Sequence, residues 1–282
     1  MRKRRTDRTA QTPPEVTACI EEFARELPET EAALLEYEGR IHFATRLPRK
    51  PGEPDSAIIR LIQGVHSSQP EMARRILRSR IFSTRPPTSM CRAMVKVAAK
   101  RLTVISAPAC DPAPRSTTSE PVFGNLDRIE IRPGPPPPLL LVSPDRVPDP
   151  MATALRMAQA IPQSGHLHQR DRPVAALLVG PDGAILGGSI NTNSKDRTRH
   201  AEVNLIQGWY ARTGLEIPSG ARIFVTLKPC RMCSAMILEC AGDRNAIQVL
   251  YAEDDPGPQA RNTCLDGTPL LLRWDQRNIA VQ

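Results

Sequence analysis

The chain has 282 residues, of which 40% are hydrophobic and only 4% aromatic, so a buried core is feasible and must be mainly aliphatic. No apolar run approaches the roughly 18 residues that cross a membrane, and no apolar segment follows the charged first residues, so neither a membrane span nor a signal peptide is expected. The net charge of +8 falls entirely within residues 1–110, which hold 20 Lys and Arg against 12 Asp and Glu, whereas residues 111–282 hold 18 of each. A basic first part attracts polyanions such as nucleic acid, although a solvated basic surface would have the same composition.

The cysteines indicate a reducing compartment. Their number, seven, is odd, and only Cys230 and Cys233 have a regular spacing. A disulfide framework would show an even number at recurring intervals. We therefore expect a cytoplasmic protein with reduced thiols. The sequence leaves open whether the chain forms a homo-oligomer.

The first part of the chain predicts a tail and a small domain. Residues 1–14 are basic and polar, as in a disordered tail, and residues 15–107 predict a small basic α+β domain of unknown function. Nothing in this domain indicates catalysis, because His42 and His66 lack acids or cysteines at a useful spacing. The expected elements are a helix over 15–27, a hairpin over 33–47 that turns at Gly39, a buried strand over 57–65, and helices over 70–81 and 88–102.

A proline-rich segment follows this domain. Residues 108–150 contain 12 prolines, four of them consecutive at 135–138. Such a composition is typical of a semi-extended linker, which we place at residues 108–148. The sequence leaves open whether residues 122–131 form a short strand within this linker.

Residues 149–282 alternate between helix and strand patterns. Helices that separate successive strands predict a mixed sheet covered by helices, and thus an α/β domain. The expected helices lie at 151–161, 200–212 and 229–240, and the expected strands at 174–179, 184–190, 221–227, 246–252 and, with a weaker pattern, 269–274.

Two short motifs place metal-binding side chains at the starts of two of these helices. The letters HAE stand at 200–202, and PCRMC stands at 229–233. Cys230 and Cys233 are one helical turn apart, so both sulfurs can face one point, and a helix N-terminus favours their thiolates. With the imidazole of His200 they make three zinc ligands and leave the fourth position open for water, as in catalytic zinc sites. We therefore predict one Zn²⁺ per chain.

A carboxylate beside this predicted metal indicates the chemistry. Bound zinc lowers the pKa of a water molecule towards neutrality. Glu202 can take the proton of that water and deliver it to a ring nitrogen and to a leaving amine. His-x-Glu followed by Pro-Cys-x-x-Cys is the signature of zinc-dependent base deaminases. A structural zinc site and a redox pair are the other interpretations of Cys-x-x-Cys, but Cys240 and Cys264 are poorly spaced for a fourth ligand.

Residues 150–275 resemble the cytidine deaminase-like superfamily, and within it the bacterial tRNA adenosine deaminases. The resemblance runs through PVAALLV at 173–179, HAE at 200–202 and VTLKPCRMCSAMI at 225–237. It implies a three-layer α/β/α fold for this domain, preceded here by the small α+β domain.

The resemblance also implies roles for particular residues. Zinc is held by His200, Cys230 and Cys233, and Glu202 is the proton shuttle. An asparagine after the second strand hydrogen-bonds the sugar of the substrate, which makes Asn191 the candidate here and Asn193 its rival.

Two features near the motifs leave the substrate open. Lys228 stands where the adenosine deaminases usually carry Glu before Pro-Cys. Lys195, Arg197 and Arg199 lead into the HAE motif and are either phosphate contacts at the mouth of the site or an ordinary polar loop.

The motifs together predict a zinc-dependent hydrolytic deaminase of a nucleobase, adenine or cytosine, within RNA or DNA. The expected partner is a nucleic acid with a single-stranded or flipped base. Two alternatives remain. One is a deaminase of free nucleosides or nucleotides, and the other is a nucleic-acid-binding or toxin-like effector with little deaminase activity.

Overall fold

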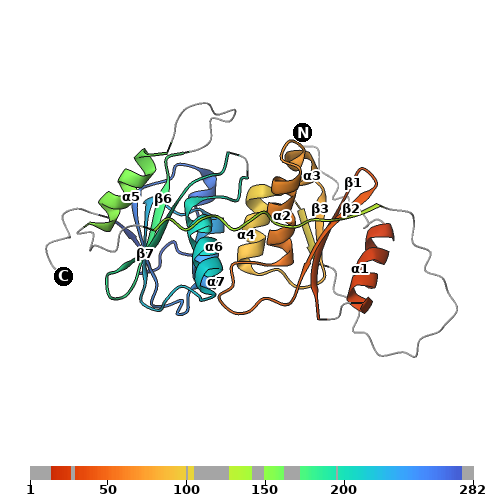
Figure 1. Cartoon of the computed structure of the whole chain (residues 1–282), viewed down its shortest axis with the longest axis horizontal. Coiled ribbons are helices and arrows are strands. Elements are labelled where there is room, and N and C mark those ends of the chain that lie inside the picture. Colours follow the sequence, from red (N-terminus) through yellow and green to blue (C-terminus); the bar gives the residue numbers. More distant parts are fainter. Residues whose placement is uncertain are drawn as a thin grey trace, which may run out of the picture.

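The computed structural model describes residues 14–26, 29–99, 101–104, 127–141, 149–161, 172–194 and 196–274. It consists of two mixed five-stranded sheets with helices between them and on their outer faces (Figure 1). The tail expected at residues 1–14 lies, except for its last residue, outside the described residues. No helix in the described part of the chain is both long enough and apolar enough to cross a membrane.

The first sheet belongs to the expected α+β domain and has the strand order β4-β3-β1-β2-β5. The hairpin of β1 (Glu31–Tyr37) and β2 (Arg40–Arg46) is confirmed, and its turn has positive φ at Glu38 and Gly39, as tight hairpin turns require. Helix α1 (Pro14–Glu26) is also confirmed and covers the outer face of this sheet, where Val16 and Ile20 pack with Leu34 and Ile41.

The segment expected as a buried strand over 57–65 is instead helix α2 (Ala57–Ser68), so that prediction is wrong. The Ser56 hydroxyl caps the helix by accepting a hydrogen bond of 3.1 Å from the backbone N–H of Ile59. Helix α2 packs against β1 and β2 and also against α4, and is buried along most of its length. A short apolar run such as AIIRLIQGV at 57–65 is ambiguous between a buried helix and a buried strand, and its isoleucines and valine favour the strand interpretation.

The helix expected over 70–81 is also mostly wrong. Only α3 (Ala73–Ile76) is helical there, and it is followed by strand β3 (Arg80–Ser83) between β1 and β4. The helix expected over 88–102 is confirmed as α4 (Ser89–Ala98). It ends earlier than expected, and strand β4 (Arg101–Val104) follows it.

The segment 108–148, expected to be a linker, is more than a spacer in its described part. Strand β5 (Asp127–Glu130) pairs with β2 as the outermost strand of the first sheet. Farther along, the backbones of Leu140 and Gly188 exchange two hydrogen bonds of 2.8 and 2.9 Å, which attach the same segment to the second sheet. Between these points the chain passes so close to Gly208 that a Cβ there would lie 2.9 Å from the Pro137 carbonyl oxygen. Residues 127–141 therefore link the two sheets by direct pairing.

The second sheet has the strand order β10-β9-β8-β6-β7, and its expected helices and strands are all confirmed. Leu177 and Phe224 point to one face and pack against α5, whereas Leu178 and Val225 point to the opposite face, which α6 and α7 cover. This is the expected three-layer α/β/α arrangement. The elements are α5 (Pro150–Gln159), β6 (Ala175–Val179), β7 (Ile185–Ile190), α6 (Ala201–Thr213), β8 (Arg222–Leu227), α7 (Arg231–Cys240), β9 (Gln248–Glu253), a 3₁₀ turn (Pro258–Ala260) and β10 (Leu271–Arg273).

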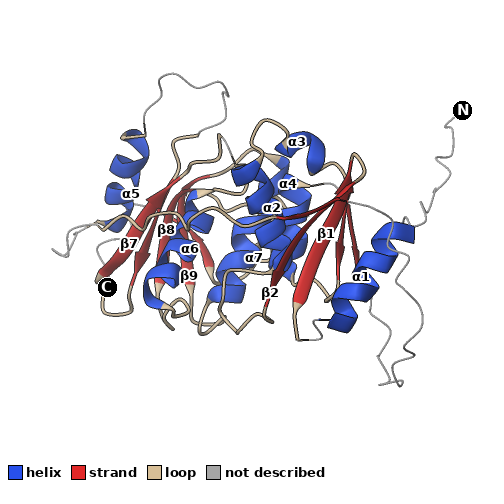
Figure 2. Ribbon diagram, turned by 45° about the vertical axis from the view of Figure 1, so that its right-hand side comes forward, coloured by secondary structure: helices blue, strands red, loops and turns tan. Residues whose placement is uncertain are grey.

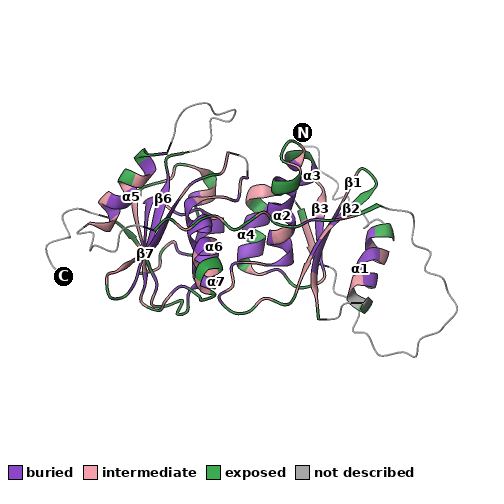
Figure 3. Ribbon diagram, in the orientation of Figure 1, coloured by how far each residue is buried: buried purple, intermediate pink, exposed green. Residues whose placement is uncertain are grey.

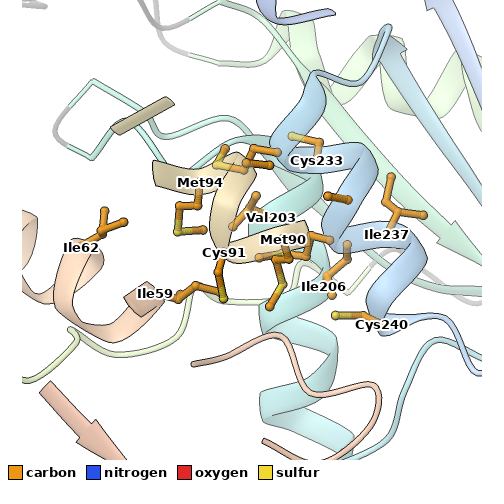
Figure 4. Packing of buried hydrophobic residues seen from close by; sticks show 14 of the residues in the cluster. Ile59, Ile62, Met90, Cys91, Met94, Val203, Ile206, Cys233, Ile237 and Cys240 are labelled. Carbon is orange, nitrogen blue, oxygen red and sulfur yellow. The ribbon is translucent and has the colours of Figure 1, made fainter. Parts of the chain in front are cut away.

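The two sheets share one helical layer. Helices α2 and α4 from the first domain pack against α6 and α7 from the second, so a single apolar core runs between the sheets (Figure 2). In Figure 4, Met90 and Met94 of α4 lie beside Val203 and Ile206 of α6.

A buried carboxylate joins the same two layers. Glu239 of α7 accepts hydrogen bonds from the Ser89 hydroxyl and, at 2.9 Å, from the backbone N–H of Met90, both in the first turn of α4. Arg49 lies 3.2 Å from the same carboxylate. These contacts fix the N-terminus of α4 to the helix that carries Cys233.

We expect the two domains to unfold together. Replacing the fully buried Met94 by Ala removes apolar contacts to both domains and should lower the free energy of unfolding by about 2–5 kcal/mol, in one transition monitored by calorimetry. Leu215→Ala, at a side chain that is 62% exposed, is the matched control and should change little. Two separate transitions, of which Met94→Ala shifts only one, would show that the core is not shared.

Candidate active site

Two helix N-termini meet at the predicted metal site. His200 is the N-cap residue of α6 and Cys230 is the N-cap residue of α7, while Cys233 lies in the first turn of α7. Neither His200 nor Cys230 uses its side chain to cap its helix, so the imidazole and the thiol remain available to each other. The positive ends of both helix dipoles favour negative charge at this point.

The ligand atoms of these three residues are spaced for one tetrahedral zinc ion. The Nδ1 atom of His200 lies 3.6 Å from the Cys230 sulfur and 3.5 Å from the Cys233 sulfur, and the two sulfurs are 3.5 Å apart. Zinc bonds of about 2.3 Å to sulfur and about 2.0 Å to nitrogen, at tetrahedral angles, require separations of roughly 3.6 Å between nitrogen and sulfur and roughly 3.8 Å between sulfurs. Among the residues that the structure describes, this is the one such group of three potential ligands. The donor set therefore fits zinc in both chemistry and spacing.

The two thiols differ in their readiness to ionise. The pKa of Cys230 is well below its usual value because the Cys233 thiol and the His200 imidazole both hydrogen-bond to its sulfur. The pKa of Cys233 is well above its usual value because this side chain is buried and close to Cys230. Burial alone would lower the pKa of His200, but the hydrogen bond and charge of Cys230 outweigh it and raise this pKa to about 9. Zinc binding requires the thiolate forms of both cysteines and the neutral form of the imidazole, and the low pKa of Cys230 favours the first of these thiolates.

Glu202 lies in the first turn of α6, directly beyond His200. Its side chain is buried, and this burial raises the pKa of the carboxyl group to about 7. A group with a pKa near neutrality can both accept and donate a proton during a reaction. The position and the pKa of Glu202 therefore suit the proton shuttle that the sequence predicts.

A cavity of about 450 Å³ opens onto this group. Ligand pockets in proteins typically measure roughly 300–1,000 Å³, so this one accommodates a single nucleoside-sized molecule. Glu202 and Cys230 line it, whereas Cys233 is fully buried and does not. The lining consists of Val97, Arg172, Val174, Asn191, Asn193, Arg197, His200, Glu202, Leu227, Lys228, Cys230, Asp255 and 257–259.

The predicted sugar-binding residue also lines the cavity. Asn191 follows β7, and its side-chain amide donates to the Arg172 carbonyl oxygen at 3.3 Å and to the Asn193 side-chain oxygen at 3.1 Å. Asn193, the rival candidate, lines the same cavity. Asn204 of α6 holds this region in place by donating a 2.9 Å hydrogen bond to the carbonyl oxygen of Ile190. The structure thus brings Asn191 and two of the three potential metal ligands, His200 and Cys230, to one cavity.

The basic residues before His200 have different environments. Arg199 turns inward, where it lies 3.3 Å from Asp196 and donates a 2.9 Å hydrogen bond to the Gln207 side chain, so it belongs to the protein interior. Arg197 lines the cavity, and Lys195 lies outside the described residues.

The loop that leads into His200 is held by the first domain. Gln63 of α2 donates a 3.1 Å hydrogen bond to the Thr198 hydroxyl and exchanges hydrogen bonds with Gln207 of α6. Asp196 accepts from both the backbone N–H and the hydroxyl of Thr198, at 2.9 and 2.8 Å. A buried polar network across the two domains therefore fixes the backbone immediately before the potential metal ligand.

Sequence reasoning missed several residues of the cavity, among them Val97, Arg172 and Asp255. Val97 comes from α4 of the first domain, and no sequence signal connects it with motifs more than 100 positions away. Asp255 follows β9 and forms a 2.7 Å ion pair with Arg172 across the cavity. The position of Asp255, directly after a strand of the predicted sheet, is the signal that would have found it.

The fold and the site geometry define the class of this protein, and comparison with known proteins agrees with them. The chain belongs to the cytidine deaminase-like superfamily. Within it, the family model described as Bd3614-like deaminase matches residues 165–276, and the model described as Bd3614-like deaminase N-terminal matches residues 32–107.

Curated relatives match only part of the chain. It is 34% identical to a tRNA(Ile)-lysidine synthase of Deinococcus deserti over 110 residues, which are 38% of this chain and 20% of the relative. It is 37% identical to a tRNA-specific adenosine deaminase of Agrobacterium fabrum over 84 residues, which are 29% of this chain and 55% of the relative. The chain therefore spans about a fifth of the first relative and about half of the second.

Solved structures of deaminases are similar as well. A structure from a study of A-to-I editing by tRNA:A34 deaminases is 33% identical, with a TM-score of 0.30, and the match covers 38% of this chain and 71% of that one. A dCMP deaminase from the cyanophage S-TIM5 is 25% identical, with a TM-score of 0.29, over 44% of this chain and 93% of that one.

Proposed function

We propose that this protein is a zinc-dependent hydrolytic deaminase that acts on adenine or cytosine within a nucleic acid. The observation that carries the proposal is the cavity itself, because it is lined by His200 and Cys230 of the potential metal-binding group and by the buried Glu202. Membership of the superfamily supports the deaminase chemistry, and the ligand spacing supports zinc.

In this proposal each residue of the site has one task. His200, Cys230 and Cys233 hold the metal, which when bound supplies an activated water as the nucleophile. Water adds to the ring carbon that bears the exocyclic amine, so that a carbon–oxygen bond forms and the carbon–nitrogen bond then breaks. Glu202 takes a proton from the water and passes it to the ring nitrogen and then to the amine, which leaves as ammonia. Asn191 binds the sugar and so orients the base.

The choice of a nucleic acid as substrate has two supports. The relatives of known function include tRNA-specific adenosine deaminases, at 34–37% identity, and tRNA(Ile)-lysidine synthases at 34%. The charge of the first 110 residues is +8, which favours a polyanion over a free nucleoside. Of the proposed substrates, adenine in RNA is favoured by the similarity to tRNA-specific adenosine deaminases.

One experiment tests the reaction and the substrate together. The full chain is incubated with mixed RNA and DNA oligonucleotides and, separately, with free nucleosides, and the products are analysed by mass spectrometry. We expect inosine or uracil in an oligonucleotide, at a rate well above that for the free nucleoside. Conversion of free nucleosides alone would replace the nucleic-acid substrate by the second candidate, and no conversion of any substrate by the zinc-loaded protein would contradict the proposed enzyme.

A further inference from the structure

In one stretch of the first domain, all the charged residues are basic. Residues 72–110 contain nine Lys and Arg and no Asp or Glu. The rest of that domain is different, because its acidic residues neutralise many of its arginines. Arg46, for example, lies 2.6 Å from Glu53, and Arg60 lies 2.6 Å from Asp55.

The fold places four of these basic residues, Arg78, Arg80, Lys96 and Arg101, at one end of the first sheet. Strands β3 and β4 are parallel, and their first residues, Arg80 and Arg101, are direct partners in the register. Helix α4 connects the two strands, so its C-terminal end, with Lys96, must lie at the end of the sheet where β4 begins. Arg78, in the turn after α3, is two residues before Arg80 and lies at that end too.

The side chains at this end are open to solvent. Arg78, Lys96 and Arg101 are exposed, and none of them forms an ion pair with a residue that the structure describes. Figure 3 shows exposed residues on α3 and α4 at the surface of the first domain. Arg74 and Arg75 of α3 are exposed as well. These five side chains, Arg74, Arg75, Arg78, Lys96 and Arg101, are called the basic surface below.

The basic surface adjoins the cavity of the second domain. Val97 follows Lys96 directly in α4, and its side chain lines the cavity that contains Glu202. The cavity has cations of its own on its walls, Arg197 and Lys228 among them. The C-terminal end of α4 therefore contributes one residue to the cavity and the next to the basic surface.

We propose that the basic surface binds the sugar–phosphate backbone of a single-stranded nucleic acid while one of its bases occupies the cavity. This inference rests on the proposed function and adds the place where the polymer binds. The cavity of about 450 Å³ holds one unstacked nucleotide, and a base inside a duplex cannot reach it. Exposed cations without acidic partners are the groups that gain most from displacing counterions along a phosphate backbone.

The test measures binding and does not depend on turnover. A fluorescently labelled single-stranded RNA of mixed sequence is titrated with the full chain, and the affinity is measured by anisotropy at several salt concentrations. The triple variant Arg78→Ala, Lys96→Ala, Arg101→Ala should bind at least about tenfold more weakly at low salt, and the slope of log affinity against log salt should flatten by about 2, since each contact to a single strand contributes about 0.7.

A triple variant with the same change of charge is the control. Arg25→Ala, Arg212→Ala, Arg244→Ala removes three exposed arginines that lie away from the cavity. Arg25 is on α1, on the outer face of the first sheet, Arg212 is at the C-terminal end of α6, and Arg244 follows α7. This variant should retain the affinity and the salt slope of the natural chain, and both variants should keep its melting temperature.

Three outcomes would overturn the inference. The first is equal weakening in both variants, which would show only an effect of net charge. The second is no weakening in the variant of the basic surface. The third is tighter binding of the natural chain to phosphatidylserine vesicles than to RNA, with loss of that binding in the same variant, because the partner would then be a membrane. Failure of the proposed deamination would appear separately, as intact RNA binding without any converted base.

Discussion

Glu202→Gln is expected to reduce kcat by about 10²–10⁴-fold while the protein keeps its zinc and its fold, since general acid–base groups contribute rate factors of this size. Glutamine has nearly the shape of the glutamate, so the packing of the buried side chain is maintained. Glutamine cannot take a proton from the water or donate one to the leaving amine, so both proton transfers lose their catalyst. The measurements are single-substrate kinetics on the most rapidly converted substrate, metal analysis and circular dichroism.

The control for this variant is Glu21→Gln, which removes an exposed carboxylate on α1. It should leave kcat and KM unchanged. Normal turnover in Glu202→Gln would exclude Glu202 as the proton shuttle, and loss of zinc in that variant would instead make Glu202 a metal ligand.

Cys230→Ala is expected to lower the zinc content from about one per chain to near zero, and deamination should be lost with it. The remaining His200 and Cys233 give only two ligands, which is too few for a stable site. Metal content is measured by mass spectrometry after dialysis against a weak chelator, and circular dichroism shows whether the fold persists.

Cys264→Ala is the matched control for the loss of a thiol. Cys264 is exposed and outside the group of three potential ligands, so this variant should keep its zinc and its activity. Full zinc occupancy in Cys230→Ala would contradict the assignment of the ligands.

The second domain and its site were predictable from the sequence because their signals are local. Each helix of that domain begins at a recognisable residue, such as Asp149, whose side chain accepts a 3.0 Å hydrogen bond from the backbone N–H of Ala152. The two halves of the metal site lie in short motifs at two helix starts. The deaminase signature connects these motifs, so His200, Cys230 and Cys233 could be selected as candidates from the sequence, and the structure brings their ligand atoms together.

The first domain was predicted less well because its structure depends on non-local contacts. Strand β3 has only four residues and is a strand because β1 and β4 pair with it on both sides. Helix α2 is rich in isoleucine, which favours a strand in isolation, and it is helical in a setting where a sheet and another helix bury it. The role of Val97 was hidden for the same reason, since it depends on how α4 packs against another domain.

The shared helical layer limits how this protein can be rearranged by genetic exchange. If the coding region for residues 149–282 were transferred alone to another gene, Val203, Ile206 and Ile237 would lose the neighbours from α4 that cover them. The isolated second domain would expose an apolar surface and would be prone to aggregation, unless the protein to which it is fused supplied helices that cover this surface. Recombination is therefore expected to preserve the two halves as one heritable unit, and an engineer who grafts the second domain onto a targeting protein should carry the first domain along with it.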